Sequence, residues 1–350
     1  MKLSVIVATR NRAHAIIPCL DSIAASLAAA ATPDAEIVVV DNGSEDQTSA
    51  IIEQWTSGSS FPVQFLSEPK AGVSRAHNLA LRTAQGELLA FTDDDCRLGK
   101  DHVNDLLRHA AADTELVLRG GRVELGDPTD LPLTIKTTPD RIRWNRSMNS
   151  ARHQPISGQI HGCNMNMHRA VVEKLGPFDE RFGPGSLIGS GNDTDYLFRA
   201  YLAYISLEYV PDMTVVHFHG RKTPAEGREL LQRYLIANGA EYAKHGWQHP
   251  NLCRPFYWDI KNAIKEILSG GISTTSIPYF SHRDKVVCAT RGAIRYLFLR
   301  EKDDARRLWD EEHDRALFSS PATLKIEALE AQGYRLHHRE GDEYYFVKDE

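Results

Sequence analysis

Three consecutive aspartates, Asp93 to Asp95, follow the apolar run Leu88–Phe91. Such a run is typical of a buried parallel strand, whose carboxyl end releases polar groups into a crevice. Neighbouring carboxylates repel one another, and each would have a raised pKa unless a cation or hydrogen-bond donors lay among them. Their oxygens suit a divalent metal that carries a diphosphate. The alternative is a solvated turn before a helix that starts near Lys100, because Asp also caps helices.

Two earlier apolar runs also end in polar clusters. Leu3–Ala8 precedes Thr9–Arg12, and Glu36–Val40 precedes Asp41–Ser44. Helical patterns separate these runs, and such alternation predicts a parallel, doubly wound sheet with right-handed crossovers. Ligands of these sheets bind at the carboxyl ends of the strands. We therefore expect the three polar clusters to lie at one edge of the sheet.

The helix after the second run has a specific start signal. Ser44 with Gln47 three residues later predicts a capping box. The following apolar residues Ile51, Ile52 and Trp55 would then lie on the buried side of this helix.

Two common phosphate-binding motifs are absent from the sequence. No G-x-G-x-x-G follows the first apolar run, and no G-x-x-x-x-G-K-[ST] occurs anywhere. The sequence therefore lacks the main evidence for a dinucleotide-binding protein or a P-loop protein. A nucleotide would have to be held by the acids: one at the second strand end accepting an N–H of the base, and others at the fourth binding ribose hydroxyls and a metal on the phosphates.

Composition excludes several classes of protein. The net charge of -6 argues against a general nucleic-acid binder. The five cysteines are widely spaced without a C-x-x-C, which indicates neither a disulfide framework nor a zinc knuckle and favours a reducing compartment. Arg10 and Asp21 interrupt the N-terminal apolar stretch, and no segment has the apolar length that a bilayer requires. We expect a cytoplasmic protein.

Four motifs, in this order, closely resemble the family 2 glycosyltransferases of the GT-A fold. They read Ser-Val-Ile-Val-Ala-Thr-Arg-Asn-Arg (4–12), Val-Val-Val-Asp-Asn-Gly-Ser (38–44), Gly-Val-Ser-Arg-Ala-His-Asn (72–78) and Gly-Glu-Leu-Leu-Ala-Phe-Thr-Asp-Asp-Asp (86–95). The resemblance covers about residues 1–220 and implies a nucleotide-sugar donor. It implies Asp41 on the base, Asp93 near the ribose and Asp95 on Mn²⁺ or Mg²⁺. The residues expected to line the nucleotide are Thr9, Arg10, Asn11, Asp41, Asn42, Lys70, Arg75, Asp93 and Asp94.

The expected fold class is α/β: a GT-A fold with a doubly wound, mainly parallel, Rossmann-like sheet and a mostly helical C-terminal extension. The catalytic domain would span 1–222, with a nucleotide-binding half (1–96) and an acceptor-binding half (97–222). The extension would span 223–350 and end in a β-hairpin.

The stretch Gly191–Arg199 has the pattern of a helix start, Gly-Asn-Asp-Thr-Asp-Tyr-Leu-Phe-Arg. In the family that this chain resembles, a Glu-Asp pair places a general base beside the acceptor hydroxyl, and the match puts that base at Asp193. Asn192 departs from the usual Glu and carries no charge, so a role of that Glu in acceptor choice would change here. The alternative is that Asp193 and Asp195 are first-turn acids stabilised by the helix dipole.

Ile205–Pro211 and Thr214–His219 predict two short strands. Alternation places His217 and His219 on one face. Imidazole is a suitable further ligand for Mn²⁺, and similar enzymes often carry a His at the position of His217; a structural histidine is the alternative. His219, Asn192 and Trp144, which lies in the long irregular stretch Gly126–Ser157, are candidates for contact with the acceptor.

The segment Arg291–Arg307 combines basic and apolar residues in a helical pattern. Such a helix can lie on an anionic membrane surface, which would add peripheral contact with the inner face of a membrane. The alternative is a helix packed on the catalytic domain with its arginines in water, which the nearby acids favour.

The function expected from these features is inverting transfer of a sugar, from a UDP-sugar as first choice, to a glycan, lipid-linked or small-molecule acceptor. A processive synthase is not indicated, because the Gln-x-x-Arg-Trp motif and membrane spans are missing. One rival is a nucleotidyltransferase, although Ala8–Arg12 lacks the expected glycines. The other is an inactive nucleotide-sugar-binding protein, with Asn192 as a first sign of decay. The sugar, the acceptor and the oligomeric state stay open.

Overall fold

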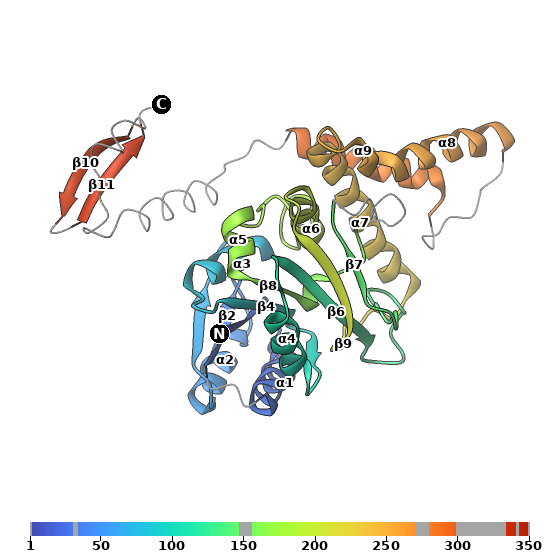
Figure 1. Cartoon of the computed structure of the whole chain (residues 1–350). Helices are drawn as coiled ribbons and strands as arrows, with labels where there is room; N and C mark the ends of the chain where they lie inside the picture. The colour runs from blue at the N-terminus through green and yellow to red at the C-terminus, as the bar shows by residue number, and fades with distance from the viewer. Residues whose placement is uncertain are drawn as a thin grey trace. The chain divides into compact units, whose positions relative to one another are not determined.

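The computed structural model describes residues 2–30, 34–146, 156–270 and 280–298, and the backbone of 334–340 and 343–348. The chain divides into two compact units, Met1–Glu301 and Lys302–Glu350. The first holds the large sheet and its helices (Figure 1). In the second, β10 (Tyr334–Glu340) and β11 (Glu343–Lys348) pair antiparallel. The part of the predicted basic helix beyond Phe298 lies outside the described residues.

The first half of the sheet consists of four parallel strands in the order β3-β2-β1-β4. The elements are β1 (Leu3–Thr9), α1 (Ile16–Ala29), β2 (Ala35–Asp41), α2 (Thr48–Gly58), β3 (Val63–Ser67), α3 (Val73–Thr83) and β4 (Leu88–Asp93). The middle strands are buried over nearly their whole length. Their apolar runs fit this position, because helices cover both faces of such a sheet.

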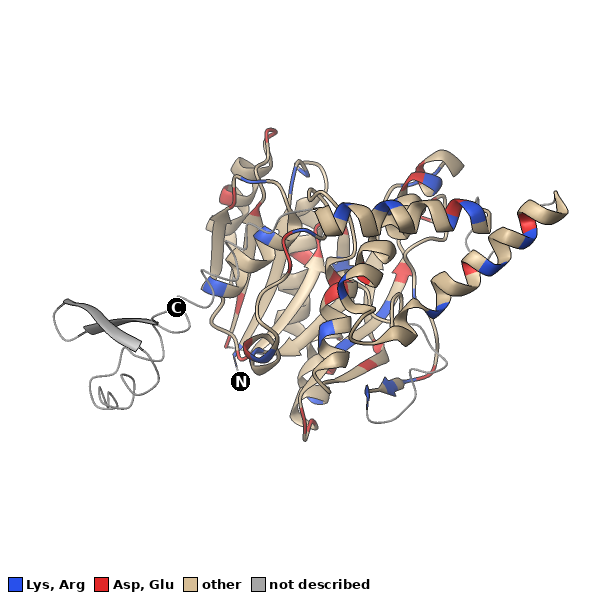
Figure 2. Ribbon diagram, turned by 90° about the horizontal axis from the view of Figure 1, so that it is seen from above, with Lys and Arg blue, Asp and Glu red and all other residues tan. Residues whose placement is uncertain are grey.

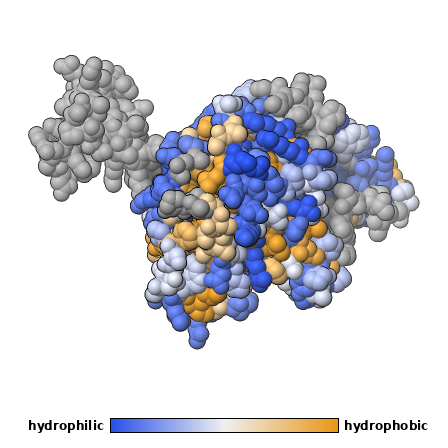
Figure 3. All heavy atoms as spheres, turned by 60° about the horizontal axis from the view of Figure 1, so that its bottom comes forward, coloured by the Kyte–Doolittle hydropathy of each residue, from blue (hydrophilic) through white to orange (hydrophobic). Residues whose placement is uncertain are grey.

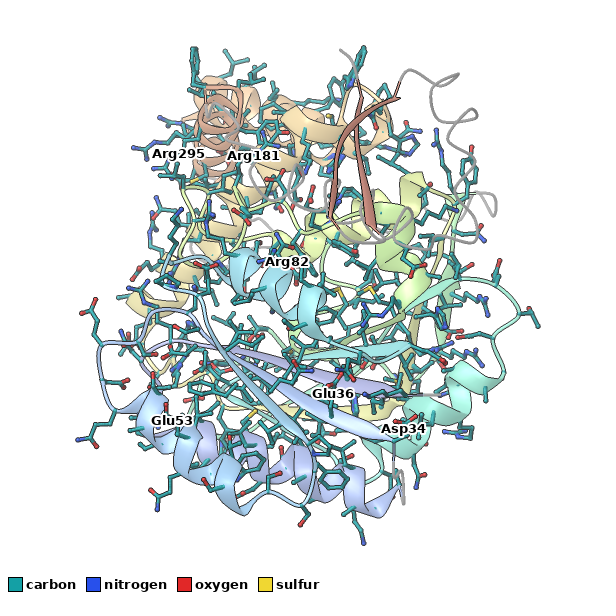
Figure 4. All side chains as sticks on the ribbon, turned by 90° about the vertical axis from the view of Figure 1, so that its left-hand side faces the viewer. Asp34, Glu36, Glu53, Arg82, Arg181 and Arg295 are labelled. Atoms are coloured by element: carbon teal, nitrogen blue, oxygen red, sulfur yellow. The ribbon has the colours of Figure 1, made fainter. Side chains whose placement is uncertain are left out.

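One carboxylate is buried at the amino ends of these strands. Glu36 lies on β2 (Figure 4) and is almost fully buried. Its oxygens accept hydrogen bonds from Ser4 Oγ (2.6 Å), Gln64 Nε2 (2.6 Å) and the Gln85 N–H (2.6 Å). Although burial raises the pKa of Glu36, these hydrogen bonds lower it below its usual value. This acid therefore joins neighbouring strands at the edge opposite the polar strand ends.

The second half of the sheet is mixed. Its elements are β5 (Cys96–Leu98), α4 (His102–Ala111), β6 (Val117–Leu125), β7 (Ile142–Trp144), β8 (Met165–His168), α5 (Arg169–Leu175), α6 (Asn192–Leu202) and β9 (Ser206–His217). The order continues β4-β8-β6-β9-β5, with β7 also on β9; β8 runs antiparallel to both of its neighbours. The two predicted short strands are one strand, β9, whose register with β6 shifts after Gly121. The predicted α/β class is confirmed.

Three helices complete the first unit. They are α7 (Pro224–His245), α8 (Arg254–Ser269) and α9 (His282–Phe298). A capping box of Thr223 and Glu226 starts α7. The backbones of α7 and α9 approach so closely that a Cβ on Gly239 would lie 1.9 Å from the Ala289 oxygen, and one on Gly292 1.8 Å from the Ile236 oxygen. Glycine is therefore required at both contacts.

The apolar core of the first unit lies mainly between the sheet and the helices α1, α2 and α4. In the part of the chain that the structure describes, no helix is long and apolar enough to cross a membrane. The predicted boundary between residues 222 and 223 falls inside the first unit. It stays a prediction about the division of function.

Candidate active site

A cleft of about 650 Å³ opens beside the carboxyl ends of β1 and β4. Three parts of the chain form its walls: the strand ends, the segment from the loop before β8 to the start of α6, and helix α7. Its lining includes Thr9, Arg10, Arg12, Asn42, Asp93, Asp94, Asp95, His161, Gly162, Asn192, Asp193, His217, Arg221, Arg233, Tyr234 and Glu241.

The strand register brings the first wall together. Thr9 on β1 pairs with Asp41 on β2, and Ala8 pairs with Asp93 on β4. Because the three strands are parallel, their last residues reach the same edge of the sheet. The expectation that the three polar clusters share one edge is therefore confirmed.

One arginine lies beside two of the three aspartates. Arg12 Nε lies 3.2 Å from Asp94 Oδ1, and Arg12 Nη2 lies 3.3 Å from Asp95 Oδ2. Burial, with the charge of Asp95, raises the pKa of Asp93 to about 7. Burial also raises the pKa of Asp94 to about 6, although Arg12 opposes the shift. Without a further cation, the cluster holds negative charge against its own repulsion.

His217 lies beside this cluster because β5 pairs with β9. Cys96, the residue after Asp95, is the register partner of His217. His217 Nε2 lies 3.2 Å from Asp95 Oδ1, and the Thr134 hydroxyl lies 3.2 Å from His217 Nδ1. Burial alone would lower the pKa of His217, but the hydrogen bond and charge of Asp95 raise it to about 9. Burial raises the pKa of Asp95, but the hydrogen bond and charge of His217, together with the charges of Arg12 and Arg221, lower it below its usual value.

The donor atoms are close enough to hold a metal ion. One ligand atom from each of Asp93, Asp95, Cys96 and His217 lies within 4.8 Å of the others. Two carboxylates and an imidazole match the ligand preferences of Mn²⁺, and the carboxylates suit Mg²⁺. The raised pKa of Asp93 marks negative charge that a divalent ion would compensate. The residues therefore fit the metal that the sequence predicts.

Asp193 forms part of the opposite wall. Helix α6 starts after Gly191, whose φ of +86° favours glycine. The Gly162 N–H donates to Asp193 Oδ2 (2.9 Å), and the Thr194 N–H donates to Oδ1 (2.8 Å). A Cβ on Gly162 would lie 3.3 Å from the Asp193 Cβ, so the loop packs tightly on this side chain. The carboxylate is thus held in one orientation at the cleft.

Asp195 lies on the same helical turn but has a different environment. It is buried, and its carboxylate lies 2.7 Å from His245 Nε2, 2.8 Å from Lys244 Nζ and 3.3 Å from Arg199 Nε. Burial raises its pKa, but the charges of Lys244 and Arg199 and the hydrogen bond with His245 outweigh burial and lower it. Asp195 therefore ties α6 to α7, and the two acids of this turn separate into one at the cleft and one in the interior.

Asp41 and Asn42 organise the loops beside the cleft. The carboxylate of Asp41 accepts hydrogen bonds from the Ser44 N–H (2.9 Å) and the Ser49 hydroxyl. The Asn42 side chain donates to the Lys70 oxygen (2.7 Å) and accepts from the Gly72 N–H (2.8 Å).

The predicted capping box of Ser44 and Gln47 is wrong. Gln47 is the N-cap of α2 but forms no side-chain cap. Asp46 accepts the hydrogen bond from the Thr48 N–H (3.0 Å) instead. Ser44 is used elsewhere, because its hydroxyl accepts from the Asn11 N–H (2.9 Å) and its own N–H donates to Asp41.

Several predicted site residues are outside the lining of the cleft. Arg75 Nη1 pairs with Glu180 Oε2 at 2.5 Å. Lys70 and Asn11 are exposed, and Asn11 Oδ1 accepts from the Glu45 N–H (2.8 Å). Trp144 is buried in β7, and the His219 ring lies 3.0 Å from the Leu131 oxygen, so these two side chains serve packing and loop structure as placed. Their proposed contacts with ligands stay predictions.

Several cleft residues were not predicted from the sequence, among them His161, Arg221, Tyr234 and Glu241. Burial lowers the pKa of His161 to about 4, and burial with the nearby Asp195 and Asp193 raises the pKa of Glu241 well above its usual value. Arg221 alone had a signal in the sequence, because it lies four residues after the candidate metal ligand His217. The α7 residues had none, because nothing in that helix's sequence indicates which side meets the cleft.

Comparison with known proteins agrees with this geometry. Residues 4–176 match the family model described as glycosyl transferase family 2. The chain is 29% identical over 241 residues to the glycosyltransferase AglE of Haloferax volcanii, covering 68% of this chain and 72% of AglE. It is 27% identical to the succinoglycan biosynthesis protein ExoM of Rhizobium meliloti, covering 54% of this chain and 60% of ExoM.

The fold also matches a solved structure, that of S. aureus TarS 1-349 in complex with UDP-GlcNAc. The TM-score is 0.51 with 17% sequence identity, covering 100% of both chains. The fold and the family model together define the class of protein, a glycosyltransferase of the GT-A fold. The segment 4–176 of this chain is identified as a glycosyl transferase family 2 domain.

Proposed function

We propose that this chain transfers a sugar from a nucleotide-sugar to a hydroxyl group with inversion at the anomeric carbon, in a single non-processive step. One observation carries the proposal: the aspartates of β4 and the oriented Asp193 of α6 line the same cleft. Donor and acceptor groups can therefore meet in one site.

Asp193 is the general base of this proposal. It takes the proton from the acceptor hydroxyl while that oxygen forms a bond to the anomeric carbon. The bond between this carbon and the diphosphate oxygen breaks, and its electron pair leaves with the nucleoside diphosphate. The hydrogen bonds from Gly162 and Thr194 support this role, because they orient the carboxylate before the acceptor arrives.

The donor would lie along the strand ends, with Asp41 at the base and Asp93 at the ribose. A uridine nucleotide is the first choice, since the TarS structure of similar fold is a complex with UDP-GlcNAc. Asp95, together with His217, would hold Mn²⁺ or Mg²⁺, which supplies charge neutralisation for the leaving diphosphate when it is bound. The acceptor class stays a glycan, a lipid-linked sugar or a small molecule, and the cytoplasmic location stays a prediction.

The first test is thermal stabilisation by UDP, GDP and dTDP, each with and without Mn²⁺. A ligand that binds only the native state raises the melting temperature. Metal-dependent stabilisation by one nucleotide is expected and would restrict the donor to that nucleotide's sugars. If none of the six conditions shifts the melting temperature, the donor assignments of Asp41, Asp93 and Asp95 fall together.

The rival functions give different products. A nucleotidyltransferase would release pyrophosphate, whereas the proposed reaction releases a nucleoside diphosphate. An inactive binding protein would be stabilised by nucleotide and metal but would release no diphosphate with any acceptor. Analysis of the released phosphates after incubation with donor and candidate acceptors therefore separates all three.

A further inference from the structure

Helix α8 buries acidic side chains and exposes apolar ones, which is the reverse of the usual pattern for a helix at a protein surface. Its buried positions are Asp259, Ala263 and Glu266, two of which are acids. Its large aliphatic residues are exposed instead: Ile264 is 52% exposed, Ile267 63% and Leu268 81%. A surface helix normally turns such residues toward the core.

The buried acids of α8 hold the start of α9. Asp259 Oδ1 lies 2.8 Å from His282 Nδ1 and 2.6 Å from Lys285 Nζ. Glu266 accepts hydrogen bonds from the backbone N–H groups of His282 (3.2 Å) and Arg283 (3.1 Å). These are first-turn groups that have no partner within their own helix. The acidic side of α8 thus contacts α9, and the apolar side of α8 faces outward.

Helix α9, which packs beside α8 (Figure 1), continues this pattern. Val287 and Ile294 are exposed, Leu297 is 69% exposed and Phe298 82%. On α8 the aromatic residues Tyr257 and Trp258 are also exposed. On the face shown in Figure 3, by contrast, hydrophobic residues form small patches among hydrophilic ones. Concentrated exposed apolar residues mark a surface that binds something.

Figure 2 shows Lys and Arg together with a few Asp and Glu along α8 and α9. The exposed charges on the described residues of these helices are all basic. They are Arg254, Lys261, Lys265, Arg283, Arg291 and Arg295. The three acids of these helices are engaged: Asp259 and Glu266 as above, and Asp284 by Ser281, whose hydroxyl lies 2.8 Å from it. The exposed charges of this surface are therefore positive, although the whole chain has a net charge of -6.

We propose that α8 and α9 dock on an anionic membrane surface, with their exposed apolar side chains in the interface and their lysines and arginines at the lipid head groups. Trp and Tyr favour this depth, as do long basic side chains whose stems are apolar. A second copy of the chain fits less well, because a symmetric contact would bring the same basic residues face to face. An anionic membrane surface accounts for both the exposed apolar side chains and the exposed basic side chains.

Docking there would place the cleft near the membrane. Helix α9 packs on α7, and α7 contributes Tyr234 and Glu241 to the cleft lining. If the proposed transfer reaction holds, a lipid-linked acceptor becomes the preferred class. This last step rests on the proposed function, whereas membrane docking itself does not.

Co-sedimentation of the full chain with vesicles tests the docking without nucleotide or acceptor. Binding is expected to vesicles that contain phosphatidylglycerol, and little to pure phosphatidylcholine. It should weaken between about 0.1 M and about 1 M salt, because the charges are screened. Absence of binding to both vesicle types would overturn the proposal and leave the transferase assignment untouched.

Variants locate the surface. The triple change Ile264→Gln, Ile267→Gln and Leu268→Gln alters exposed side chains and should reduce vesicle binding at least about tenfold while the melting temperature is kept. Arg291→Gln with Arg295→Gln should weaken binding about fivefold per residue. The matched control Lys100→Gln with Lys174→Gln removes the same charge from exposed positions elsewhere and should bind normally.

Two results would contradict the assignment to α8 and α9. Wild-type binding by the triple variant would place the membrane contact elsewhere. A wild-type dimer that dissociates in the triple variant, with no vesicle binding by either protein, would show that a second copy covers this surface. Analytical ultracentrifugation of both proteins separates these outcomes.

Discussion

Two acidic regions of this molecule have similar sequences and opposite electrostatics. Asp93 to Asp95 end the strand β4, and Asp193 and Asp195 lie in the first turn of α6. In the first region burial raises the pKa of Asp93 to about 7 and that of Asp94 to about 6. In the second, the cations around Asp195 outweigh burial and lower its pKa. In the first region the nearby cations do not offset burial at Asp93 and Asp94, whereas in the second region they outweigh burial at Asp195.

The difference in charge environment separates acids whose repulsion a bound cation would relieve from an acid that stabilises helix packing. Arg12 lies beside both Asp94 and Asp95, and His217 lies beside Asp95. Asp195 is met by three side chains, Lys244, His245 and Arg199, of which Lys244 is shared with Asp179. A cluster whose repulsion is not compensated gains most from a divalent ion. Removal of a buried acid that pairs with cations instead lowers the stability of the protein. Asp193 belongs to neither group, since backbone N–H groups orient it at the cleft.

The largest expected effect is on catalysis at Asp193. Asp193→Asn keeps the shape of the side chain but removes the base, so the rate of transfer should fall about 10²- to 10⁴-fold. Donor binding, measured by nucleotide-dependent thermal stabilisation, should stay nearly unchanged. Asp34→Asn, the same change at an exposed position, is the matched control. Retained turnover in Asp193→Asn would remove this residue from the mechanism.

The next effect is on stability at Asp195. Asp195→Asn removes the carboxylate that pairs with Arg199 and Lys244, although Lys244 keeps Asp179, and should lower the free energy of unfolding by about 3 kcal/mol. Urea unfolding at neutral pH measures this loss. Because the folded pKa of Asp195 is lowered, its stabilisation is present at neutral pH and should be lost as the solution is acidified. A variant as stable as wild type would show that the contrast between the two regions has no energetic basis.

Metal binding at Asp95 should show a smaller change. Asp95→Ala removes a carboxylate from the group formed with Asp93, Cys96 and His217. Loss of a group around a metal typically costs about 10- to 100-fold in affinity, and we expect at least this loss for Mn²⁺. Titration of Mn²⁺ in the presence of nucleotide, followed by thermal shift, measures it. Asp195→Asn should keep the thermal-shift response to Mn²⁺. Equal losses of Mn²⁺ affinity in both variants would show that the two acidic regions do not differ in metal binding.

The smallest effect is the pH dependence of the metal-free protein. The folded pKa of Asp93, about 7, lies above the ordinary value of an aspartate. Its stabilising contribution is therefore complete below pH ~4 and is lost as the pH rises through about 7. Asp93→Asn should match wild type near pH 4 and exceed it at pH 8, by up to about 1.4 kcal/mol for each pKa unit between the unfolded and folded values. Urea unfolding in a chelator tests this, and parallel pH profiles for the two proteins would contradict it.

Sequence reasoning was strongest where local pattern and long-range order agree. The apolar runs that end at Thr9, Asp41 and Asp93 predicted both the strands and the edge at which they meet, because parallel strands end on one side. It was weaker where one residue has competing partners. Ser44 matched a capping pattern, yet its hydroxyl receives the Asn11 N–H from a neighbouring strand end. A local motif cannot reveal such a partner.

The sequence by itself determined the α/β class, the family resemblance and the acids at the carboxyl ends of the strands, since these depend on residue order and periodicity. Only the tertiary structure decided which acids lack compensation. Asp193 and Asp195 are two residues apart, but the packing of α7 on α6 gives Asp195 its cations and leaves Asp193 at the cleft. The outward apolar side of α8 was decided in the same way, because its acids are turned inward by the start of α9. Charge environment depends on distances through space, which the order of residues does not specify.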